Sequence, residues 1–200
     1  MSKELRPAII MLIALTLITG LIYPLAITGV AQVLFPHQAN GSLIVKDGQI
    51  TGSELIGQLF TEPKYFHGRP SATTKPDPAD LSKTVDAPYN AASSGGANLG
   101  PTNKALIERV KAEMERLKAE NPTATIPIDL VTTSASGLDP DISPRAALLL
   151  QVARVAKTHY AGVSHPRAGK PRQRRAYCLL GEPRVNVLNL NRALDSLGGG

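Results

Sequence analysis

An uncharged stretch near the N-terminus constrains this chain more than any other feature of its sequence. From Ala8 to Phe35 it runs for 28 residues without Asp, Glu, Lys or Arg. A helix of that length extends about 42 Å at 1.5 Å per residue, which exceeds the roughly 30 Å hydrocarbon core of a membrane. A signal peptide ordinarily has an apolar region of only about 7 to 15 residues before a small-x-small cleavage site. Because the run here continues to Phe35, we interpret residues 8–35 as an uncleaved transmembrane helix.

The residues that precede this helix predict its orientation. Lys3 and Arg6 lie before it, and basic residues that flank a span are preferentially kept in the cytoplasm. Residues 1–7 are therefore expected inside the cell and residues 36–200 outside it, because long domains cross largely regardless of their charge. This is the pattern of a single-pass protein of the cell inner (plasma) membrane. The lone cysteine, Cys178, cannot form an internal disulfide and so does not test the assignment.

Residues that a simple anchor does not need interrupt the apolar stretch. Thr16, Gly20, Pro24 and Thr28 follow one another at intervals of four, which places them near one side of a helix. Small residues on one side allow neighbouring membrane helices to approach closely. We therefore predict that these four residues form a packing face and that Pro24, which lacks an N–H group, kinks the helix. The alternative is the ordinary content of Gly and Pro in membrane helices.

Beyond the membrane helix, the sequence predicts a single loop-rich domain, which gives the chain an α+β fold class. About 165 residues are enough for one mixed helix and strand domain with its own core, and the chain holds 17 Gly and 16 Pro. Asp47-Gly48 predicts a two-stranded hairpin with a type I′ turn, and Ser53 predicts the start of a short helix after it. Residues 61–101 are rich in Pro, Gly, Ser, Asp and Asn, which indicates a long loop where a binding surface should be sought.

Helices and strands are predicted to alternate in the remainder of the chain. One helix, capped at Thr102 or Asn103, is expected to run to about Glu120, and another should begin at Ser143-Pro144. The stretches TIPIDLVTT (125–133) and RVNVLNL (184–190) indicate short strands, the second followed by one or two helical turns. The residues predicted to face the core are Leu106, Ile107, Val110, Met114, Leu117, Ile126, Ile128, Leu130, Leu148, Leu149, Val152 and Val155.

The sequence contains no set of residues that predicts an enzyme acting alone. The glycine-rich stretch SGGANLGP (94–101) lacks the Gly-Lys-Ser/Thr of a phosphate loop, and no serine has a Gly-x-Ser-x-Gly context. The four histidines have no zinc-binding spacing with one another or with Cys178, so no metal site is expected. Asp139 and Asp141 are expected to form Asx-turns that lead into Ser143. Basic residues do not alternate with aromatic ones, so nucleic acid is not an expected partner.

Loop motifs in a fixed order resemble those of a known family. They follow an N-terminal LRPA…TGLIYPLAITGVAQVLFPHQANGSLI and read YFHGRPSA (65–72), YNAASSGGANLGPTN (89–103), SGLDPDISP (136–144) and LGEPRVNVLNLN (180–191). Together they resemble the C subunit of the bacterial Kdp-type potassium-transporting P-type ATPase. The resemblance covers Leu5 to about Lys157 and again Leu180 to Asp195.

This resemblance implies an accessory role in a high-affinity, ATP-driven potassium import complex. In that family the chain accompanies a channel-like potassium-translocating subunit, a P-type subunit that hydrolyses ATP, and a very small membrane subunit. The C subunit has no phosphorylation site of its own. It is described as necessary for the assembled complex and as a catalytic chaperone that raises the affinity of the pump subunit for ATP. No tightly bound cofactor is implied, and ATP would be reached through the pump subunit.

The implied chaperone role conflicts with the predicted orientation. The basic flank places the soluble domain outside the cell, where there is no ATP, whereas the chaperone role needs contact with cytosolic nucleotide. The family's topology agrees with the outside placement, over the potassium entrance of the channel-like subunit. Direct contact with ATP is therefore the weaker expectation.

One segment departs from the family pattern. Residues 158–179 read THYAGVSHPRAGKPRQRRAYCL, where the family has a helix followed by a His-Thr-Glu-Gly-Arg type sequence. One interpretation is a diverged surface loop. The other is a pair of compensating frameshifts, which reading the DNA in the adjacent frames would reveal.

The first loop motif also supplies candidates for a protein interface. Arg69 follows three aromatic or imidazole side chains in a turn rigidified by Pro70, a composition enriched at interface hot spots. The interface candidates are Tyr65, Phe66, His67, Arg69 and, from the second motif, Asn98. Alternatively, Arg69 caps loop carbonyls in its own domain. The alternative for the whole chain is a self-contained, membrane-anchored extracytoplasmic binding module whose ligand is held between Phe60 and Pro101.

Overall fold

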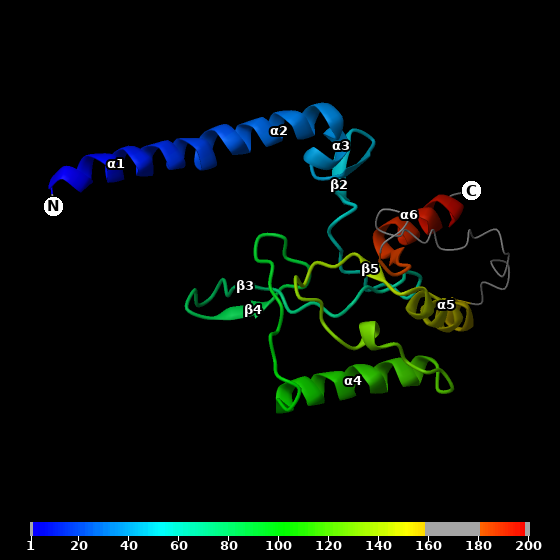
Figure 1. Cartoon of the computed structure of the whole chain (residues 1–200). Coiled ribbons are helices and arrows are strands. Elements are labelled where there is room, and N and C mark those ends of the chain that lie inside the picture. The colour runs from blue at the N-terminus through cyan, green and yellow to red at the C-terminus, as the bar shows by residue number, and fades with distance from the viewer. Residues whose placement is uncertain (1, 159–180, 199–200) are drawn as a thin grey trace. The chain divides into compact units, whose positions relative to one another are not determined.

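The computed structural model describes residues 2–158 and 181–198 and divides the chain into two compact units (Figure 1). The first unit ends at Ser53 and the second begins at Glu54. The hairpin that follows the candidate membrane helix thus belongs with that helix, and the rest of the predicted 36–200 domain forms the second unit. Apart from Thr158, the departing segment 158–179 lies outside the described residues.

A continuous helix dominates the first unit. It consists of α1 (Ser2–Leu17), a π-helical turn η1 (Ile18–Ile22) and α2 (Tyr23–Leu34). Its 32 residues from Lys3 to Leu34 are long and apolar enough to cross a membrane, and none of the most apolar window is buried in the chain itself. The π-turn directly precedes Pro24, which cannot donate to the carbonyl of Gly20. Instead the N–H of Tyr23 bonds to the oxygen of Ile18, five residues back.

A short helix and a β-hairpin complete the first unit. Helix α3 (Pro36–Ala39) leads into β1 (Leu43–Lys46), which pairs antiparallel with β2 (Gln49–Ser53). Asp47 and Gly48 have φ of 52° and 78°, which confirms the predicted type I′ turn. The short helix predicted from Ser53 is wrong. The hydroxyl of Ser53 donates to the oxygen of Gly41 over 2.7 Å, so it ties the ends of the hairpin together and caps no helix.

The second unit has few strands and long irregular connections (Figure 1). In the predicted loop 61–101, β3 (Thr74–Pro76) and β4 (Thr84–Asp86) form a small antiparallel hairpin. Farther along, β5 (Asp141–Ile142) pairs antiparallel with β6 (Val185–Asn186). Every sheet of the described chain has only two strands. Most backbone groups of the loops must therefore find partners outside a sheet.

The two predicted long helices are present, and their caps are those expected from the sequence. Helix α4 (Lys104–Glu120) follows Asn103, whose side-chain oxygen accepts from the N–H of Ala105 over 2.9 Å. Helix α5 (Pro144–Thr158) follows Ser143, whose hydroxyl accepts from the N–H of Ala146 over 3.1 Å. Both helices therefore begin where a side-chain oxygen satisfies a free N–H group.

The predicted core faces of these helices are only partly correct. Leu117 and Leu149 are buried, whereas Ile107 and Leu148 are 53% and 57% exposed. Met114 is also exposed, and Leu106 and Val110 are half-buried. The side chains of Val152 and Val155 lie outside the described set. On α5 the buried side also includes Leu150 and the two alanines Ala146 and Ala147, whose small side chains allow the helix to approach its neighbours closely.

The strand predicted for residues 125–133 is wrong. A 3₁₀-helix, η2 (Ile128–Leu130), occupies its middle, and Ile128 is 76% exposed, although the prediction placed it inward. Asp129 explains the difference, because its carboxylate accepts from the N–H of Ser143 over 2.7 Å and thereby supports the start of α5. A strand would turn Asp129 and its neighbours to opposite faces in strict alternation.

The last predicted strand is shorter, and its helix longer, than expected. Strand β6 holds only two residues, and α6 (Val187–Gly198) begins directly after it. The side-chain oxygen of Asn186 accepts from the N–H of Asn189 over 2.9 Å, so this asparagine caps the start of α6.

One cluster of buried side chains forms the core of the unit. Its members are Phe66, Leu117, Leu130, Val131, Ile142, Ala146, Ala147, Leu149, Leu150, Val185 and Val187.

A buried asparagine on α6 holds the first loop motif against this core. The side chain of Asn191 is 1% exposed. Its amide oxygen accepts from the N–H of Phe66 over 2.8 Å, and its amide nitrogen donates to the oxygen of Phe66 over 2.9 Å. The Asn191 amide therefore makes, for the backbone of Phe66, the two hydrogen bonds that a neighbouring strand would otherwise make.

We predict that Asn191→Ala lowers the free energy of unfolding by about 2 to 4 kcal/mol, because it leaves both backbone groups of Phe66 buried without partners. Urea unfolding of the full chain in detergent, followed by circular dichroism, measures this change. Arg192→Ala, at the exposed neighbouring position, is the matched control and should have little effect. Equal stability of the two variants would contradict the role assigned to Asn191.

Candidate functional site

The loop motifs of the second unit meet around two small hydroxyl side chains. The hydroxyl of Ser71 donates to the oxygen of Gly137 over 2.7 Å and accepts from the N–H of Tyr89 over 3.0 Å. The hydroxyl of Thr73, which is buried, donates to the oxygen of Ala87 over 2.6 Å. Residues that are far apart in the sequence are thus joined through side-chain oxygens and not through strand pairing.

Tyr89 is the largest side chain within this network. Its hydroxyl donates to the oxygen of Arg69 over 2.7 Å, and its backbone has a φ of 60°. A Cβ atom added to Gly57 would collide with the Tyr89 ring and lie 2.9 Å from the oxygen of Asp139, and one added to Gly68 would collide with the Tyr89 hydroxyl. Burial raises the pKa of Tyr89 to about 12, and the nearby Asp139 carboxylate adds to this effect.

Arg69 joins the first motif to the third within the same unit. Its guanidinium donates to the carboxylate of Asp139 over 3.1 Å and to the oxygen of Thr133 over 3.2 Å. Longer bonds of 3.4 Å reach the carbonyl and hydroxyl oxygens of Thr132. The arginine side chain is 24% exposed. This geometry is that of a residue that caps loop carbonyls, and a role for Arg69 in binding another protein stays a prediction.

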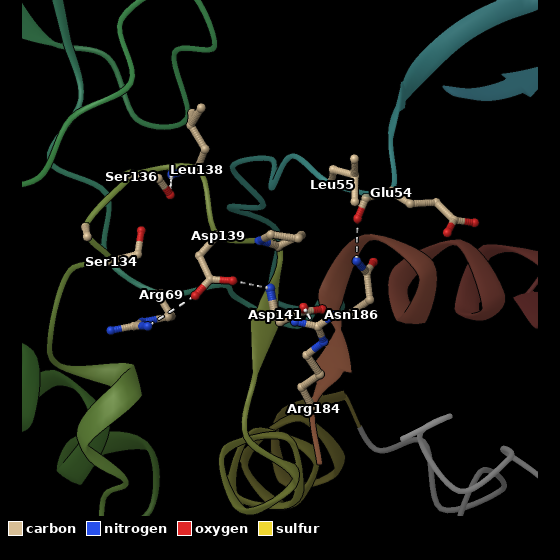
Figure 2. A pocket seen from close by; sticks show the side chains of 12 residues that line it. Glu54, Leu55, Arg69, Ser134, Ser136, Leu138, Asp139, Asp141, Arg184 and Asn186 are labelled. Carbon is tan, nitrogen blue, oxygen red and sulfur yellow. Dashed lines mark hydrogen bonds and ion pairs between the residues drawn. The ribbon is translucent and has the colours of Figure 1, made fainter. Parts of the chain in front are cut away.

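An open groove of about 450 Å³ lies beside Arg69 (Figure 2). Arg69 pairs with Asp139 at one part of it, and Arg184 pairs with Asp141 over 3.1 Å at another. The Asx-turn predicted at Asp139 is present, since the N–H of Asp141 bonds to the side chain of Asp139 over 3.0 Å. At Asp141 the prediction is wrong, because the N–H of Ser143 bonds to Asp129 instead. Each positive charge thus has a negative partner, and the groove presents a polar surface with little net charge.

The other predicted interface residues lie in different environments. The hydroxyl of Tyr65 donates to Asp195 over 2.8 Å, and its ring packs against Phe60 with centroids 5.2 Å apart. The Nδ1 of His67 lies 2.7 Å from the oxygen of Phe60, so this nitrogen carries the proton. Phe66 is 5% exposed and belongs to the core, so its side chain is not available as a surface contact. Asn98, which is exposed, has a φ of 49°.

The four predicted packing residues of the membrane helix are all exposed in the single chain. In a regular α-helix, three steps of four residues overshoot three turns by about 1.2 residues. A π-turn holds one residue more than an α-turn, so η1, which contains Gly20, reduces this offset to about 0.2 residue. Thr16 and Thr28 thereby come close to the same side of the helix. A Cβ atom added to Gly20 would meet nothing within 4 Å.

Some residues that build the site were not predicted from the sequence. Tyr89, Ser71 and Asn191 were not singled out, because their partners lie 18 to 125 residues away in the sequence. A signal was available in Gly57 and Gly68, whose missing side chains make room for the Tyr89 ring. In the part of the chain that the structure describes, no group of His, Cys, Asp and Glu could hold a metal ion.

This chain is similar to known proteins along almost its whole sequence. The family model of the K⁺-transporting ATPase c chain matches residues 5–196. The Potassium-transporting ATPase KdpC subunit of Rhodopseudomonas palustris is 66% identical over 200 residues, covering 98% of this chain and 99% of the relative. The subunit of the same name from Methylobacterium nodulans is 61% identical over 201 residues and covers 100% of both chains. That from Bradyrhizobium diazoefficiens is 63% identical over 197 residues, covering 98% of each.

The raised pKa of Tyr89 predicts a loss of stability in alkali. Because the pKa rises from 10.0 to about 12 on folding, the neutral hydroxyl stabilises the fold fully below pH 10, and this contribution is lost as the pH rises towards 12. Tyr89→Phe should cost about 1 kcal/mol at neutral pH through the lost hydrogen bond and should remove this pH-dependent step. Urea unfolding at a series of pH values measures both effects. The bond to Asp195 also raises the pKa of Tyr65, so Tyr65→Phe is the comparison variant: it removes that contribution and should retain the part of the step that belongs to Tyr89. A step unchanged in Tyr89→Phe would contradict the assignment.

Removing Arg69 should destabilise the second unit. Arg69→Ala leaves Asp139 and the oxygen of Thr133 without their donor, and we expect a loss of about 2 kcal/mol in the free energy of unfolding. Arg184→Ala removes a single, half-exposed ion pair and should cost less than about 1 kcal/mol. Thermal unfolding of both variants tests the difference. Normal stability of Arg69→Ala, together with weaker binding to another protein, would instead make Arg69 an interface anchor.

Proposed function

Because the chain belongs to the family of K⁺-transporting ATPase c chains, we propose that it holds a K⁺-importing complex together and itself performs no chemistry. Membership makes the chain a subunit of a K⁺-transporting ATPase with one candidate N-terminal span. The observation that carries the proposal is the hydrogen-bonded loop network around Ser71, Thr73 and Tyr89. Such a network fixes an irregular surface in one conformation, and a preorganised surface binds partners at a lower entropic cost.

The proposed partners are the other subunits of the complex. These are a channel-like potassium-translocating subunit, a P-type ATP-hydrolysing subunit and a small membrane subunit. We place the second unit outside the cell because Lys3 and Arg6 precede the span. A surface of loops is suited to contact the extracellular side of a channel-like protein, since loops carry recognition in many scaffolds.

The role of catalytic chaperone belongs to the same proposal. A unit outside the cell reaches no cytosolic ATP, so a raised ATP affinity of the pump subunit would be transmitted through the membrane helices. Two sites coupled in this way share a coupling free energy that is typically about 1 to 3 kcal/mol. The half-saturating ATP concentration of the ATPase, with and without this chain, measures that coupling.

The membrane helix provides the proposed contact for this transmission. Its predicted packing face consists of residues that are small or lack a backbone N–H group, namely Thr16, Gly20, Pro24 and Thr28. The π-turn aligns these four residues along nearly the same side of the helix. In lipid, close approach of backbones is a main source of helix association, because lipid tails are as apolar as the side chains. We propose that this face packs against a helix of another subunit.

Recovery of the complex tests the assembly role. The full complex is extracted in mild detergent and isolated through a tag on the pump subunit, and the amount of this chain is measured. Gly20→Leu should reduce recovery without preventing membrane insertion, since it adds bulk at the packing face while raising hydrophobicity. Ala26→Leu, half a turn away from that face, is the matched control and should be recovered normally.

The possible outcomes separate the two parts of the proposal. If the unmodified chain is isolated alone, the assembly role fails and the chain is a self-contained anchored module. If Gly20→Leu and Ala26→Leu are recovered equally well, the packing face is wrong while the assembly role stands.

A further inference from the structure

Helix α4 carries an arginine, Arg109, that does not line the groove at Arg69. Arg109 lines a pocket of about 290 Å³ together with residues 96–99, Leu106 and residues 132–135. Its Nε atom is buried and has no hydrogen-bond partner, and it alone has this property among the buried side-chain nitrogen and oxygen atoms of the described chain. We refer to this cavity as the Arg109 pocket.

The ion pairs seen on α4 join other residues and do not include Arg109. The ammonium nitrogen of Lys104 lies 3.7 Å from a carboxylate oxygen of Glu108. Guanidinium nitrogens of Arg116 lie 2.9 Å from a carboxylate oxygen of Glu113 and 3.5 Å from one of Glu120. Glu113, one turn from Arg109, could have formed an ion pair with it. No ion pair within the described residues involves Arg109.

A buried guanidinium Nε–H without a hydrogen-bond partner is unfavourable. A buried donor on a charged group costs more than a neutral one when it has no partner, because it has lost its water. Native structures contain few such groups, and each calls for a physical explanation. A ligand that accepts hydrogen bonds and carries negative charge would remove the cost at Arg109.

The walls of the pocket indicate which ligand fits. Asn98 also lines the pocket and is exposed. Within residues 2–158 and 181–198 its side-chain amide forms no hydrogen bond, so the amide N–H groups are a second donor at the pocket. Gly96 packs closely on the loop opposite, since an added Cβ atom would lie 2.8 Å from the oxygen of Ala135. Leu99 and Leu106 supply apolar surface. Thr132, Thr133 and Ser134 add polar groups to the wall. One cation, one amide, these hydroxyl residues and the two leucines suit the carboxylate and methylene groups of an Asp or Glu side chain.

We propose that the Arg109 pocket binds a carboxylate side chain from another subunit of the K⁺-transporting ATPase. This inference rests on the proposed assembly role and adds to it a defined point of contact. Arginine binds carboxylates through two parallel N–H···O bonds, which fix orientation as well as adding energy. The groove at Arg69 does not serve this purpose, because both of its arginines already have aspartate partners.

Zero-length crosslinking tests the proposal directly. Arg109→Lys keeps the positive charge and introduces an amine into the pocket. A water-soluble carbodiimide activates a carboxylate as an O-acylisourea. The lysine amine then attacks the activated carbonyl carbon, and the carbodiimide leaves as its urea. The carboxyl and amino groups are thereby joined in an amide bond, and the water they lose is taken up in the urea. We expect a crosslink between position 109 and a carboxylate of another subunit in the intact complex, located by mass spectrometry. Arg116→Lys is the matched control, which should crosslink within this chain to Glu113 or Glu120.

A second variant measures the contribution of the contact. Arg109→Gln removes the charge and should lower recovery of the chain with the tagged pump subunit about tenfold or more, since it leaves the partner's carboxylate unpaired. The thermal stability of the isolated chain should not fall, because the arginine has no partner to lose there.

The remaining outcomes overturn the proposal. A crosslink from position 109 only to Glu113 of the same chain, or no crosslink specific to Arg109→Lys, would show that no partner carboxylate enters the pocket. Stabilisation of the isolated chain by inorganic phosphate that Arg109→Gln abolishes, with no crosslink, would assign the pocket to a free anion. If the unmodified chain is not recovered with the pump subunit, the assembly role itself fails, and this contact fails with it.

Discussion

The need to satisfy backbone hydrogen bonds in a domain with almost no sheet shapes the second unit. Its strands hold two or three residues each, so ladders account for little of its backbone. Buried amides and carbonyls must nevertheless have partners. Ser71, Thr73, Asn191 and Arg69 provide them by bonding to the backbone of other loops. The side chains of the loop motifs thus take the place that neighbouring strands have in other folds.

Charge is distributed over this unit in two ways. At the groove, arginines and aspartates neutralise one another and hold loops in place, so their contribution is mainly structural. On α4, Arg109 faces a pocket with no acid of its own chain within ion-pairing distance among the described residues. An arginine already paired within its own chain gains little from a partner's carboxylate, whereas an unpaired one is free to form a new charge-assisted hydrogen bond. The two arginine environments therefore separate the residues that maintain the fold from the one placed for recognition.

How far the fold could be predicted depended on the sequence distance over which each signal acts. The Asp47-Gly48 turn and the caps at Asn103 and Ser143 were correct, because turns and caps are decided within a few residues. The strand at residues 125–133 was wrong because Asp129 bonds to Ser143, 14 residues away, and no local pattern contains that information. The loop motifs were identified as a set, but the partners of Tyr89 and Asn191 could not be, since they depend on the completed fold. Phe66 and Arg69 illustrate the same limit, because both lie in a turn whose composition suggests a surface. Phe66 is nevertheless buried, and the half-buried Arg69 is hydrogen-bonded to distant segments.

The bond between Asn191 and Phe66 has a consequence for the time at which this protein can fold. The two residues are separated by 125 positions, and Tyr65 and Glu54 likewise bond to Asp195 and Asn186 near the C-terminus. At a synthesis rate of about 5 to 20 residues per second, the first motif waits about 6 to 25 s for its closing partner. Throughout that interval, the backbone of Phe66 lacks the asparagine of α6 with which it pairs in the complete fold. Helix α6 therefore completes the packing of the second unit, and a chain released before α6 is made would leave the first motif accessible to proteases.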